Sequence, residues 1–585
     1  MINDTMPTRK QALVFAGKAK IFQGKRTIEN LLAKIQRHES KGNQDGFQIV
    51  GESSTPLWTE DHAAERELTA GKIQNLRVAA KSLDRVVVPA GEIFSFWKQV
   101  GRITTKKGYV VGRELREGCI IPNLGGGLCQ LSNGLYNAAL KAGFETVERH
   151  AHSQQVPGSL AAVGRDATVF WNYVDLRFRH THAFQISVRL SKNHLHIQLL
   201  SQMGGHEQPE LSSIENTKVA EVGNCLSCGV NACFRNVPAE KLDKALGTTS
   251  YLLDAYTPEF QSYLTKSISN QDQVLLPIHA KRWRAPAYRW SVPTNDEGHQ
   301  RVQFATRIAF ARSLKLRSLP PEGGVLQKTL LKYDRKLAKY FASRIDHRST
   351  HLVVSQNLLP HLWELGAMGG RTFDVWATRY PMEILQSKLD VASEIHPTSP
   401  TLADFRVSEN LAGLETEAFK NARRVITPHY DVGRNVAEVF GIEVDMLDWA
   451  VPEVNLSNRL YNKESSDKCV IAFPASPLGK KGVYEFRDAL KGIDAEVLIL
   501  GTADEGVVIP NSRHASVSEV MQADVLVLPA YVEHSPRPLL RALALGIPVI
   551  ASKACGIPEQ DGLTIVDYPD QDKLRSILEA MFPRG

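Results

Sequence analysis

Two series of short apolar runs, separated by helical segments, occupy the second half of this 585-residue chain. The runs are rich in Val, Ile and Leu, as expected for strands that are buried on both faces of a parallel sheet. The first series comprises residues 249–254, 274–278, 351–355, 373–376 and 424–427, and the second comprises 469–473, 496–500, 523–529, 548–551 and 563–566. The alternation predicts two successive doubly wound, Rossmann-like domains with a cleft between them.

The whole chain is expected to be a multidomain α/β protein, because 585 residues are too many for one hydrophobic core. Residues 1–50 are predicted to be a basic leader or cap, and residues 51–200 a mixed α+β domain. Residues 201–240 have the composition of a linker that carries a cysteine cluster. The two Rossmann-like domains are then predicted over residues 241–450 and 451–585.

Charge and hydropathy limit the classes of molecule that the protein is expected to bind and the compartment in which it is expected to act. The formal net charge of +7 is spread along the chain, so it only mildly favours anionic partners such as nucleotides or a membrane surface. Basic residues do not gather with aromatic ones, which argues against nucleic-acid binding. Neither a signal sequence nor a membrane span is apparent, so we predict a cytoplasmic protein for which peripheral membrane contact stays open.

Three glycines at 125–127 lead into a segment of helical periodicity in which Leu128, Leu131 and Leu135 share one face. Glycine adopts the backbone conformations that such a tight turn requires. Cys129 would lie in the first helical turn, where the positive end of the helix dipole favours a thiolate. It is therefore a candidate nucleophile, although buried cysteines are more often inert packing residues.

His150, His152 and Asp175 could complete a site around this thiol. The two histidines are two residues apart and would share one face of a strand, and Asp175 lies in another strand-like run. Cysteine, histidine and an orienting acid are the components of an activated thiol nucleophile. The alternative is structural, because these residues and Asp166 can also be ordinary partners of the backbone beside a glycine turn.

The same part of the chain resembles the VanW family. The matching stretches are 67–77, 89–97, 125–132, 148–153 and 164–168, in this order. The resemblance implies the family of the domain but no particular reaction.

Local patterns within this domain predict a helix over residues 68–83 and a strand and turn over residues 86–91. Further strands are expected at 168–173, 184–190 and 194–200, the last two joined as a hairpin through Ser-Lys-Asn. The stretch at 51–66 is interpreted as an acidic approach to the first helix.

Cys225, Cys228 and Cys233 form a C-x2-C-x4-C pattern in the linker. Two cysteines two apart can chelate one metal ion, and a third four residues later can reach the same ion or cluster. Zinc would need a fourth ligand, for which His206 is a candidate, whereas an iron–sulfur cluster could leave one iron open. Both metals remain possible, and three structural thiols are the alternative.

Stretches 523–530, 533–551 and 556–559 resemble the C-terminal domain of GT-B glycosyltransferases with retaining, glycogen-synthase-like chemistry. The resemblance implies a nucleotide-sugar donor and an unidentified acceptor. Residues 474–482 match the place where that family has a lysine followed by glycine, which implies that Lys481, beside Gly482, neutralises the donor diphosphate. Independently, a lysine beside a glycine after a strand is suited to holding an anion.

Two positions depart from that family pattern. The family has two glutamates eight residues apart, one near the transferred sugar and one at the donor ribose. Here Glu533 matches the first, but Arg541 occupies the second, and an arginine cannot accept a ribose hydroxyl hydrogen bond. Ser476 replaces a family arginine, so Lys480, Arg537 or Arg541 would have to supply the missing positive charge.

Three functions are compatible with the sequence. The first is a nucleotide-sugar-dependent glycosyltransferase, whose fusion to a VanW-like domain suggests work on cell-envelope or surface glycoconjugates. The second is an acyl-transfer type of reaction at Cys129 with His150 or His152 as base. The third is a degenerate, metal-bearing binding or scaffold protein. The sequence leaves the oligomeric state undetermined.

Overall fold

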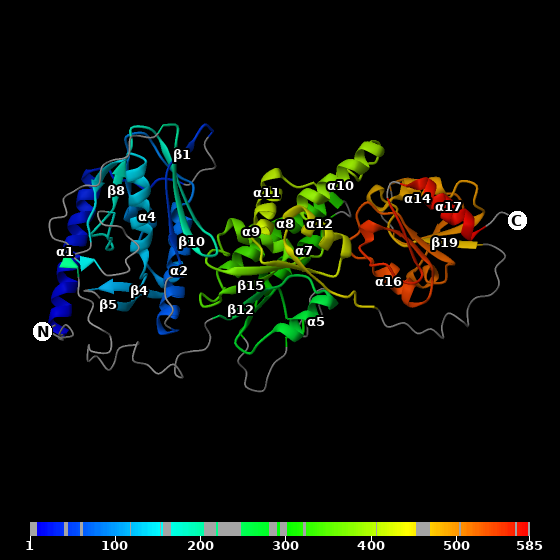
Figure 1. Ribbon diagram of the computed structural model, residues 1–585, viewed down its shortest axis with the longest axis horizontal. Coiled ribbons are helices and arrows are strands. Elements are labelled where there is room, and N and C mark those ends of the chain that lie inside the picture. Colours follow the sequence, from blue (N-terminus) through cyan, green and yellow to red (C-terminus); the bar gives the residue numbers. More distant parts are fainter. Residues whose placement is uncertain are drawn as a thin grey trace. The chain divides into compact units, whose positions relative to one another are not determined.

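The structure is a computed structural model in which the chain forms two compact units. Unit 1 comprises Met1–Thr248, Ile345–Thr350 and Leu365–Arg371, and unit 2 comprises Thr249–Arg344, His351–Glu364 and Thr372–Gly585 (Figure 1). The structure describes residues 9–39, 45–58, 63–116, 119–151, 154–155, 165–203, 218–219, 247–279, 289–292, 301–319, 323–404, 406–451, 469–501, 505–567 and 570–582. No helix in these ranges is long and apolar enough to cross a membrane.

Unit 1 is built around a four-stranded antiparallel sheet. Its strand order is β1 (Gln48–Pro56), β10 (His194–Ser201), β9 (Phe184–Leu190) and β2 (Val86–Val88). Helices α4 (Leu128–Lys141) and α2 (Ala63–Leu83) pack against this sheet. The approach of α4 is close, because a Cβ at Gly51 would lie 2.3 Å from the Ala138 carbonyl oxygen.

Smaller elements complete unit 1. One antiparallel sheet has the order β3 (Ile93–Ser95), β8 (Arg177–Arg179) and β6 (Glu145–Glu148), and β4 (Val111–Arg116) pairs with β5 (Cys119–Leu124). Short strands β7 (Gln154–Gln155) and β11 (Lys218–Val219) also pair. Helices α1 (Arg9–Leu32), α3 (Phe96–Val100) and the 3-10 turn η1 (Thr105–Lys107) connect or flank these sheets.

The structure confirms most of the predicted elements of unit 1 and corrects two. The helix, the strand at 86–88 and the hairpin are present, and the Ser191 N–H donates to the His194 carbonyl across the hairpin turn. The predicted strand at 168–173 is wrong. Asn172 has a φ of 47° and belongs to a tight turn, which the Val174 N–H closes on the Phe170 carbonyl. Of the residues predicted as an acidic approach, 51–56 belong to β1, which begins before the expected boundary at residue 50, and 63–66 form the start of α2.

The first half of unit 2, called the N-lobe, contains a seven-stranded, wholly parallel sheet. The strand order is β14 (Arg301–Phe304), β13 (Gln273–Leu276), β12 (Thr249–Leu252), β15 (His351–Ser355), β16 (Thr372–Trp376), β17 (Arg424–Thr427) and β18 (Glu443–Met446). The accompanying helices are α5 (Pro258–Ser267), α7 (Thr306–Arg317), α8 (Gly323–Ala342), α9 (Leu359–Glu364), α10 (Met382–Ile395), α11 (Glu409–Lys420) and α12 (Tyr430–Phe440), with η5 (Gln356–Leu358).

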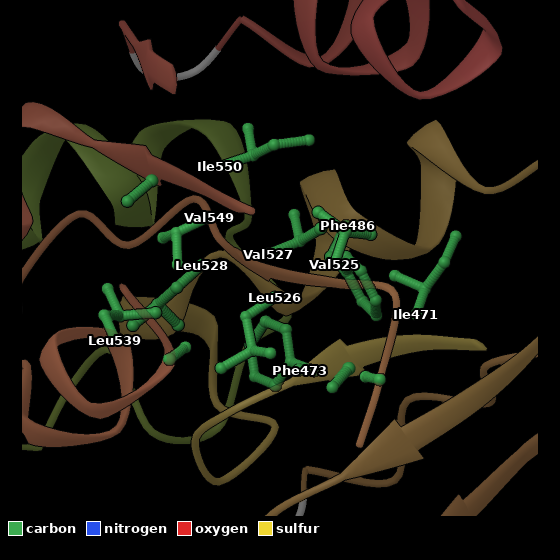
Figure 2. Close-up of a cluster of buried hydrophobic side chains, with 14 of the residues drawn as sticks. Ile471, Phe473, Phe486, Val525, Leu526, Val527, Leu528, Leu539, Val549 and Ile550 are labelled. Carbon is green, nitrogen blue, oxygen red and sulfur yellow. The ribbon is translucent and has the colours of Figure 1, made fainter. Parts of the chain in front are cut away.

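The second half of unit 2, called the C-lobe, contains a six-stranded parallel sheet. The strand order is β21 (Ser512–His514), β20 (Ala495–Ile499), β19 (Cys469–Phe473), β22 (Val525–Leu528), β23 (Val549–Ser552) and β24 (Leu563–Val566). Its helical elements are η6 (Gly479–Lys481), α14 (Val483–Ala489), α15 (Val517–Val520), α16 (Arg537–Ala544), η7 (Lys553–Cys555) and α17 (Gln571–Met581). Figure 2 shows Ile471, Phe473, Val525 and Leu526 of the central strands packed in its core.

All ten apolar runs predicted from the sequence are strands of these two sheets, so the expectation of two doubly wound domains is confirmed. Three further strands, β14, β18 and β21, escaped prediction. Each lies at the edge of its sheet and buries less of its surface than the central strands. An edge strand therefore need not be continuously apolar, and its sequence signal is weak.

Candidate functional site

The two sheets of unit 2 reverse their strand order at equivalent positions. In the C-lobe this point lies between β19 and β22, and in the N-lobe it lies between β12 and β15. Loops that leave the carboxyl ends of such neighbouring strands diverge to opposite faces of the sheet and leave a crevice, which is where doubly wound proteins bind ligands. The topology thus identifies one ligand crevice in each lobe.

Lys481 and Glu533 meet at the C-lobe crevice. Lys481 follows β19, Glu533 follows β22, and the Lys481 Nζ lies 2.8 Å from Glu533 Oε2 and 3.0 Å from the Val532 carbonyl oxygen, to which it donates. The Ser535 N–H donates to the other carboxylate oxygen at 2.8 Å. Burial opposes ionisation of Glu533, but Lys481 and this N–H outweigh it and hold the pKa of Glu533 below its usual value.

Gly482 fixes the backbone beside this ion pair. Its φ is 77°, and a Cβ at this position would lie 2.0 Å from the Pro529 carbonyl oxygen. Only glycine therefore lets η6 approach the end of β22 so closely. The neighbouring Lys480 accepts hydrogen bonds at its carbonyl from the Tyr531 and Val532 N–H groups, which ties the two loops together.

The Lys480 side chain is deeply placed in the same loop. Burial, together with the charge of Lys481, lowers the pKa of Lys480 to about 7. A bound anion would favour the protonated amine and reverse this shift. The loop thus offers two ammonium groups to an anionic ligand at neutral pH, one of which titrates in that range.

Two histidines, the buried His429 and the partly exposed His534, lie at the loop that carries Glu533. The Val432 N–H donates to His429 Nδ1 at 3.1 Å, and His429 Nε2 donates to the Glu533 carbonyl oxygen at 2.7 Å. Burial lowers the pKa of His429 and holds that of His534 well below the usual histidine value. Both rings are therefore neutral, and the hydrogen-bond pattern assigns the Nε2–H tautomer to His429.

An acid–base cluster lies at the N-lobe crevice. Arg312 donates from its two terminal nitrogens to Asp254 at 2.7 Å and 3.3 Å, and to Asp334 at 3.1 Å. Asp254 lies two residues after the end of β12, and its N–H donates to the Ser355 hydroxyl at the end of β15. Burial and the nearby Asp254 raise the pKa of Asp334.

Both crevices open into one cavity of about 460 Å³. The N-lobe lines it with the Asp254, Arg312 and Asp334 cluster, with Arg379, and with aliphatic side chains from α7, α8 and α10. The C-lobe lines it with Lys480, Lys481, Val532 and His534. A cavity of this size, with an apolar wall and convergent charged groups, is typical of a small-molecule site.

Two of the arginines singled out in the sequence are not among the described residues that line the cavity. Arg537 donates through both terminal nitrogens to the buried Glu259 at 2.7 Å and 2.8 Å, and its guanidinium lies 5.2 Å from the centre of the Trp449 ring. Arg541 is exposed on α16 and is not among the described residues that line the cavity. Ser476 packs against Gly501, where a Cβ would lie 2.5 Å from the Ser476 Oγ.

Unit 1 places Cys129 in the first turn of α4, as predicted. The thiol is partly exposed and lies 3.7 Å from the Thr168 hydroxyl, whereas the His150 Nε2 lies 3.2 Å from Glu148 Oε1. His150 follows the end of β6, and its carbonyl accepts from the Thr168 N–H. Thr168 therefore connects the two segments, but the described bonds of the thiol and of the imidazole go to different partners. A nucleophilic role for Cys129 stays a prediction.

Asp175 is buried in a structural network. Its carboxylate accepts from the Ser95 hydroxyl at 2.6 Å, the Trp97 N–H at 3.1 Å and Arg177 at 2.9 Å. Burial nevertheless raises the pKa of Asp175, although these donors oppose the shift. Asp166 is also buried, and its carbonyl accepts from Arg149. His152, the other predicted base, lies outside the described residues.

Cys225, Cys228, Cys233 and His206 also lie outside the described residues. Within the described part of the chain, no group of three or more His, Cys, Asp or Glu side chains is arranged to hold a metal ion. The metal prediction therefore rests on the cysteine spacing alone.

Asp254, Arg312, Asp334 and His534 are site residues that sequence reasoning missed. The position of Asp254, two residues after the first strand of a doubly wound domain, was a usable signal because this end of the strand borders the crevice. Arg312 and Asp334 reach the cavity only through tertiary packing, whereas His534 directly follows Glu533 in the same loop.

Two separate parts of the chain match models of known protein families. Residues 71–200 match the family model "VanW like protein", and residues 488–573 match the model "Glycosyl transferases group 1". The protein YoaR of Bacillus subtilis (strain 168) is 38% identical over 118 residues, which cover 20% of this chain and 38% of YoaR. The vancomycin B-type resistance protein VanW of Enterococcus faecalis (strain ATCC 700802 / V583) is 29% identical over 216 residues, covering 34% of this chain and 75% of that protein.

Two solved structures show a distant similarity to more than half of the chain. Anabaena Alr3699/HepE, in complex with UDP and glucose, has a TM-score of 0.35 at 13% identity, covering 58% of this chain and 90% of that one. WaaG, a glycosyltransferase involved in lipopolysaccharide biosynthesis, has the same TM-score at 14% identity and the same coverage of both chains.

Residues 71–200 are therefore VanW-like, and residues 488–573 are similar to glycosyltransferases of group 1. The former region contains antiparallel strands of unit 1, and the latter lies in the C-lobe, the second of the two parallel, doubly wound lobes of unit 2. A glycosyltransferase is the class of enzyme that the C-terminal part of the chain supports.

Proposed function

We propose that the protein is a nucleotide-sugar-dependent glycosyltransferase whose donor binds at the C-lobe crevice. The observation that carries this proposal is the ion pair between Lys481 and Glu533, which lies where β19 and β22 diverge. Lys481 Nζ donates to the Glu533 carboxylate and to the Val532 carbonyl oxygen. The oxygens of a diphosphate would be hydrogen-bond acceptors of the same kind. In the bound state Lys481 and Lys480 would neutralise the leaving diphosphate, and Glu533 would lie near the donor sugar.

The acceptor is proposed to enter from the N-lobe side of the same cavity. The aliphatic side chains of α7, α8 and α10 provide apolar contact area there, and the cluster of Asp254, Arg312 and Asp334 provides hydrogen-bonding groups. Burial of an acceptor against this wall would exclude water from the transfer site. The donor ribose needs a hydrogen-bond acceptor other than residue 541, because the exposed Arg541 supplies only donors.

A role in the synthesis of cell-envelope or surface glycoconjugates is the second part of the proposal. It is supported by the fusion of the transferase region to a domain whose relative is a vancomycin resistance protein. We also propose that the reaction takes place in the cytoplasm, where nucleotide sugars are available.

Thermal stabilisation by ligands tests the proposal. Anaerobically purified protein would be melted with a panel of nucleoside diphosphates and nucleotide sugars, beside Lys481→Ala and a matched control, Lys553→Ala. Lys553 belongs to the same lobe but pairs with Asp567 at the surface, with about half of its side chain exposed. A ligand that binds only the folded state must raise the melting temperature by mass action.

The expected result is that one nucleotide stabilises the wild type and Lys553→Ala but not Lys481→Ala. Glu533→Gln provides a second variant, since it removes the carboxylate while it leaves the lysine charge in place. If no nucleotide stabilises the wild type, or if Lys481→Ala responds equally, the donor site is not at this crevice. The first result would favour a binding or scaffold protein, and the second would place nucleotide binding elsewhere in the chain.

A further inference from the structure

Helix α1 of unit 1 contacts its domain mainly through polar side chains, beside one ring contact between Phe22 and Tyr173, whose ring centres are 4.9 Å apart. Arg26 donates to both carboxylate oxygens of Glu148 at 2.8 Å and 2.6 Å, and to the Tyr173 carbonyl at 3.0 Å. Gln23 donates to the Trp171 carbonyl, and Asn30 accepts from Arg177. Figure 1 shows α1, in blue, alongside the other elements of unit 1. The side that faces the domain is therefore held by charge-assisted and polar hydrogen bonds.

The opposite side of the same helix is apolar and exposed. Ile21, Ile28, Leu31 and Leu32 expose 72%, 59%, 71% and 80% of their surface. At about 100° per residue, Ile21, Ile28 and Leu32 lie within about 20° of one direction, whereas Gln23, Arg26 and Asn30 point the opposite way. A helix on a protein surface normally turns its apolar stripe toward the core and its polar side toward water. The faces of α1 have the reverse arrangement.

Exposed lysines border this apolar stripe on both sides. Lys18 and Lys25 flank it on one side, where Lys25 Nζ lies 3.8 Å from Glu29 Oε1, and Lys20 flanks it on the other, by the same angular count. Basic residues also dominate the helix as a whole, since its sequence contains Arg9, Lys10, Lys18, Lys20, Lys25 and Arg26 against the single acidic residue Glu29. An apolar stripe between basic flanks is the pattern of helices that lie in the interface of an anionic membrane.

We propose that the outer face of α1 docks on the surface of an anionic lipid bilayer, with the aliphatic stripe inserted between headgroups and the lysines on the lipid phosphates. The polar contacts of the inner face keep unit 1 attached while the stripe is inserted. A second copy of the chain is a poorer occupant, because symmetric pairing of two stripes would bring the flanking lysines of both copies together. The proposal is independent of the transferase reaction.

Vesicle co-sedimentation of the full-length protein tests this docking. The probes are vesicles of phosphatidylglycerol mixed with phosphatidylcholine and vesicles of phosphatidylcholine alone, each at low and high salt. The wild type is expected to bind the mixed vesicles, and to bind less at high salt because screening weakens the contribution of the lysines. Ile21→Ser/Ile28→Ser is expected to weaken binding by about tenfold or more, and Lys18→Gln/Lys25→Gln by about tenfold.

Val439→Ser/Ile395→Ser is the matched control. Val439 and Ile395 are exposed aliphatic residues on α12 and α10, at 59% and 42%, so the same chemical change is made away from α1. Its binding should equal that of the wild type, and all variants should keep the wild-type melting temperature because the substituted side chains are exposed.

Three results would overturn the proposal. The wild type could fail to sediment with the mixed vesicles, it could bind both vesicle types equally at every salt concentration, or Ile21→Ser/Ile28→Ser could bind as tightly as the wild type. Analytical ultracentrifugation adds one more test. A concentration-dependent dimer that the same double variant abolishes, without vesicle binding by the wild type, would assign the stripe to a second copy of the chain.

Discussion

The substitution Arg537→Ala in unit 2 distinguishes a structural role of this arginine from a role in ligand binding. The sequence resemblance makes Arg537 a candidate for donor binding, whereas the structure pairs it with Glu259. The Glu259 side chain is completely buried, and its carboxylate accepts two hydrogen bonds from Arg537 and one, at 2.7 Å, from the Ala450 N–H. Arg537→Ala removes two of these three bonds.

The cost of Arg537→Ala follows from the charge that it leaves behind. Removing one partner of a buried ion pair costs about 3–5 kcal/mol, because the other charge stays buried without compensation. Arg537 is 31% exposed, so water can partly replace it and the lower end, about 3 kcal/mol, applies. Loss of the contact with the Trp449 ring adds about 0.5 kcal/mol. Glu259→Gln/Arg537→Met, which removes both charges, should lose less stability than the single variant.

Hydrogen–deuterium exchange measures this loss of stability at the segments that surround Arg537. For Arg537→Ala, amides of α5 and of the segment around Ala450 should exchange about a hundredfold faster, which corresponds to about 3 kcal/mol of local opening free energy. The double variant should recover part of the protection. If Arg537→Ala leaves these amides unchanged and instead abolishes nucleotide binding, the structural assignment of Arg537 is refuted.

Three further predictions concern the loop of Lys481 and the cysteine cluster. Nucleotide affinity, followed by calorimetry, should be constant below pH 7 and fall by up to about tenfold per pH unit above it. The reason is that Lys480, whose pKa is about 7, must take up a proton to pair with the diphosphate, and Lys480→Met should abolish this dependence. Gly482→Ala should lower the urea unfolding midpoint by the equivalent of about 3 kcal/mol, since its Cβ would lie 2.0 Å from the Pro529 carbonyl oxygen. Elemental analysis of anaerobically purified protein should find zinc or iron. The triple variant Cys225→Ser/Cys228→Ser/Cys233→Ser should lack this metal.

The parallel sheets were predictable because strands that are buried on both faces have to be apolar throughout. The runs at 351–355 and 424–427, for example, coincide with β15 and β17 in both bounds. The turn around Asn172 was not predictable in this way. Its aromatic and β-branched neighbours favour a strand, and the left-handed backbone of one asparagine overrides that local preference.

The residues of the candidate site also fall into those that a local sequence pattern reveals and those that only tertiary packing brings together. Lys481, Gly482 and Glu533 were found from the sequence because each lies in a short motif that follows one strand. The cluster of Arg312 with Asp254 and Asp334 was missed, because its members are 58 and 22 residues apart and meet only after α7 and α8 have packed on the sheet. The partner of Arg537 was missed for the same reason, as 278 residues separate it from Glu259.

The central claim is that a nucleotide sugar binds where β19 and β22 diverge, and differential hydrogen–deuterium exchange tests it most directly. The exchange of the full-length protein would be compared with and without a saturating concentration of the nucleotide that stabilises it most. The account predicts slower exchange in residues 474–482 and 529–535, and the loss of that protection in Lys481→Ala. Protection confined to other parts of the chain, or protection that persists in Lys481→Ala, would contradict it.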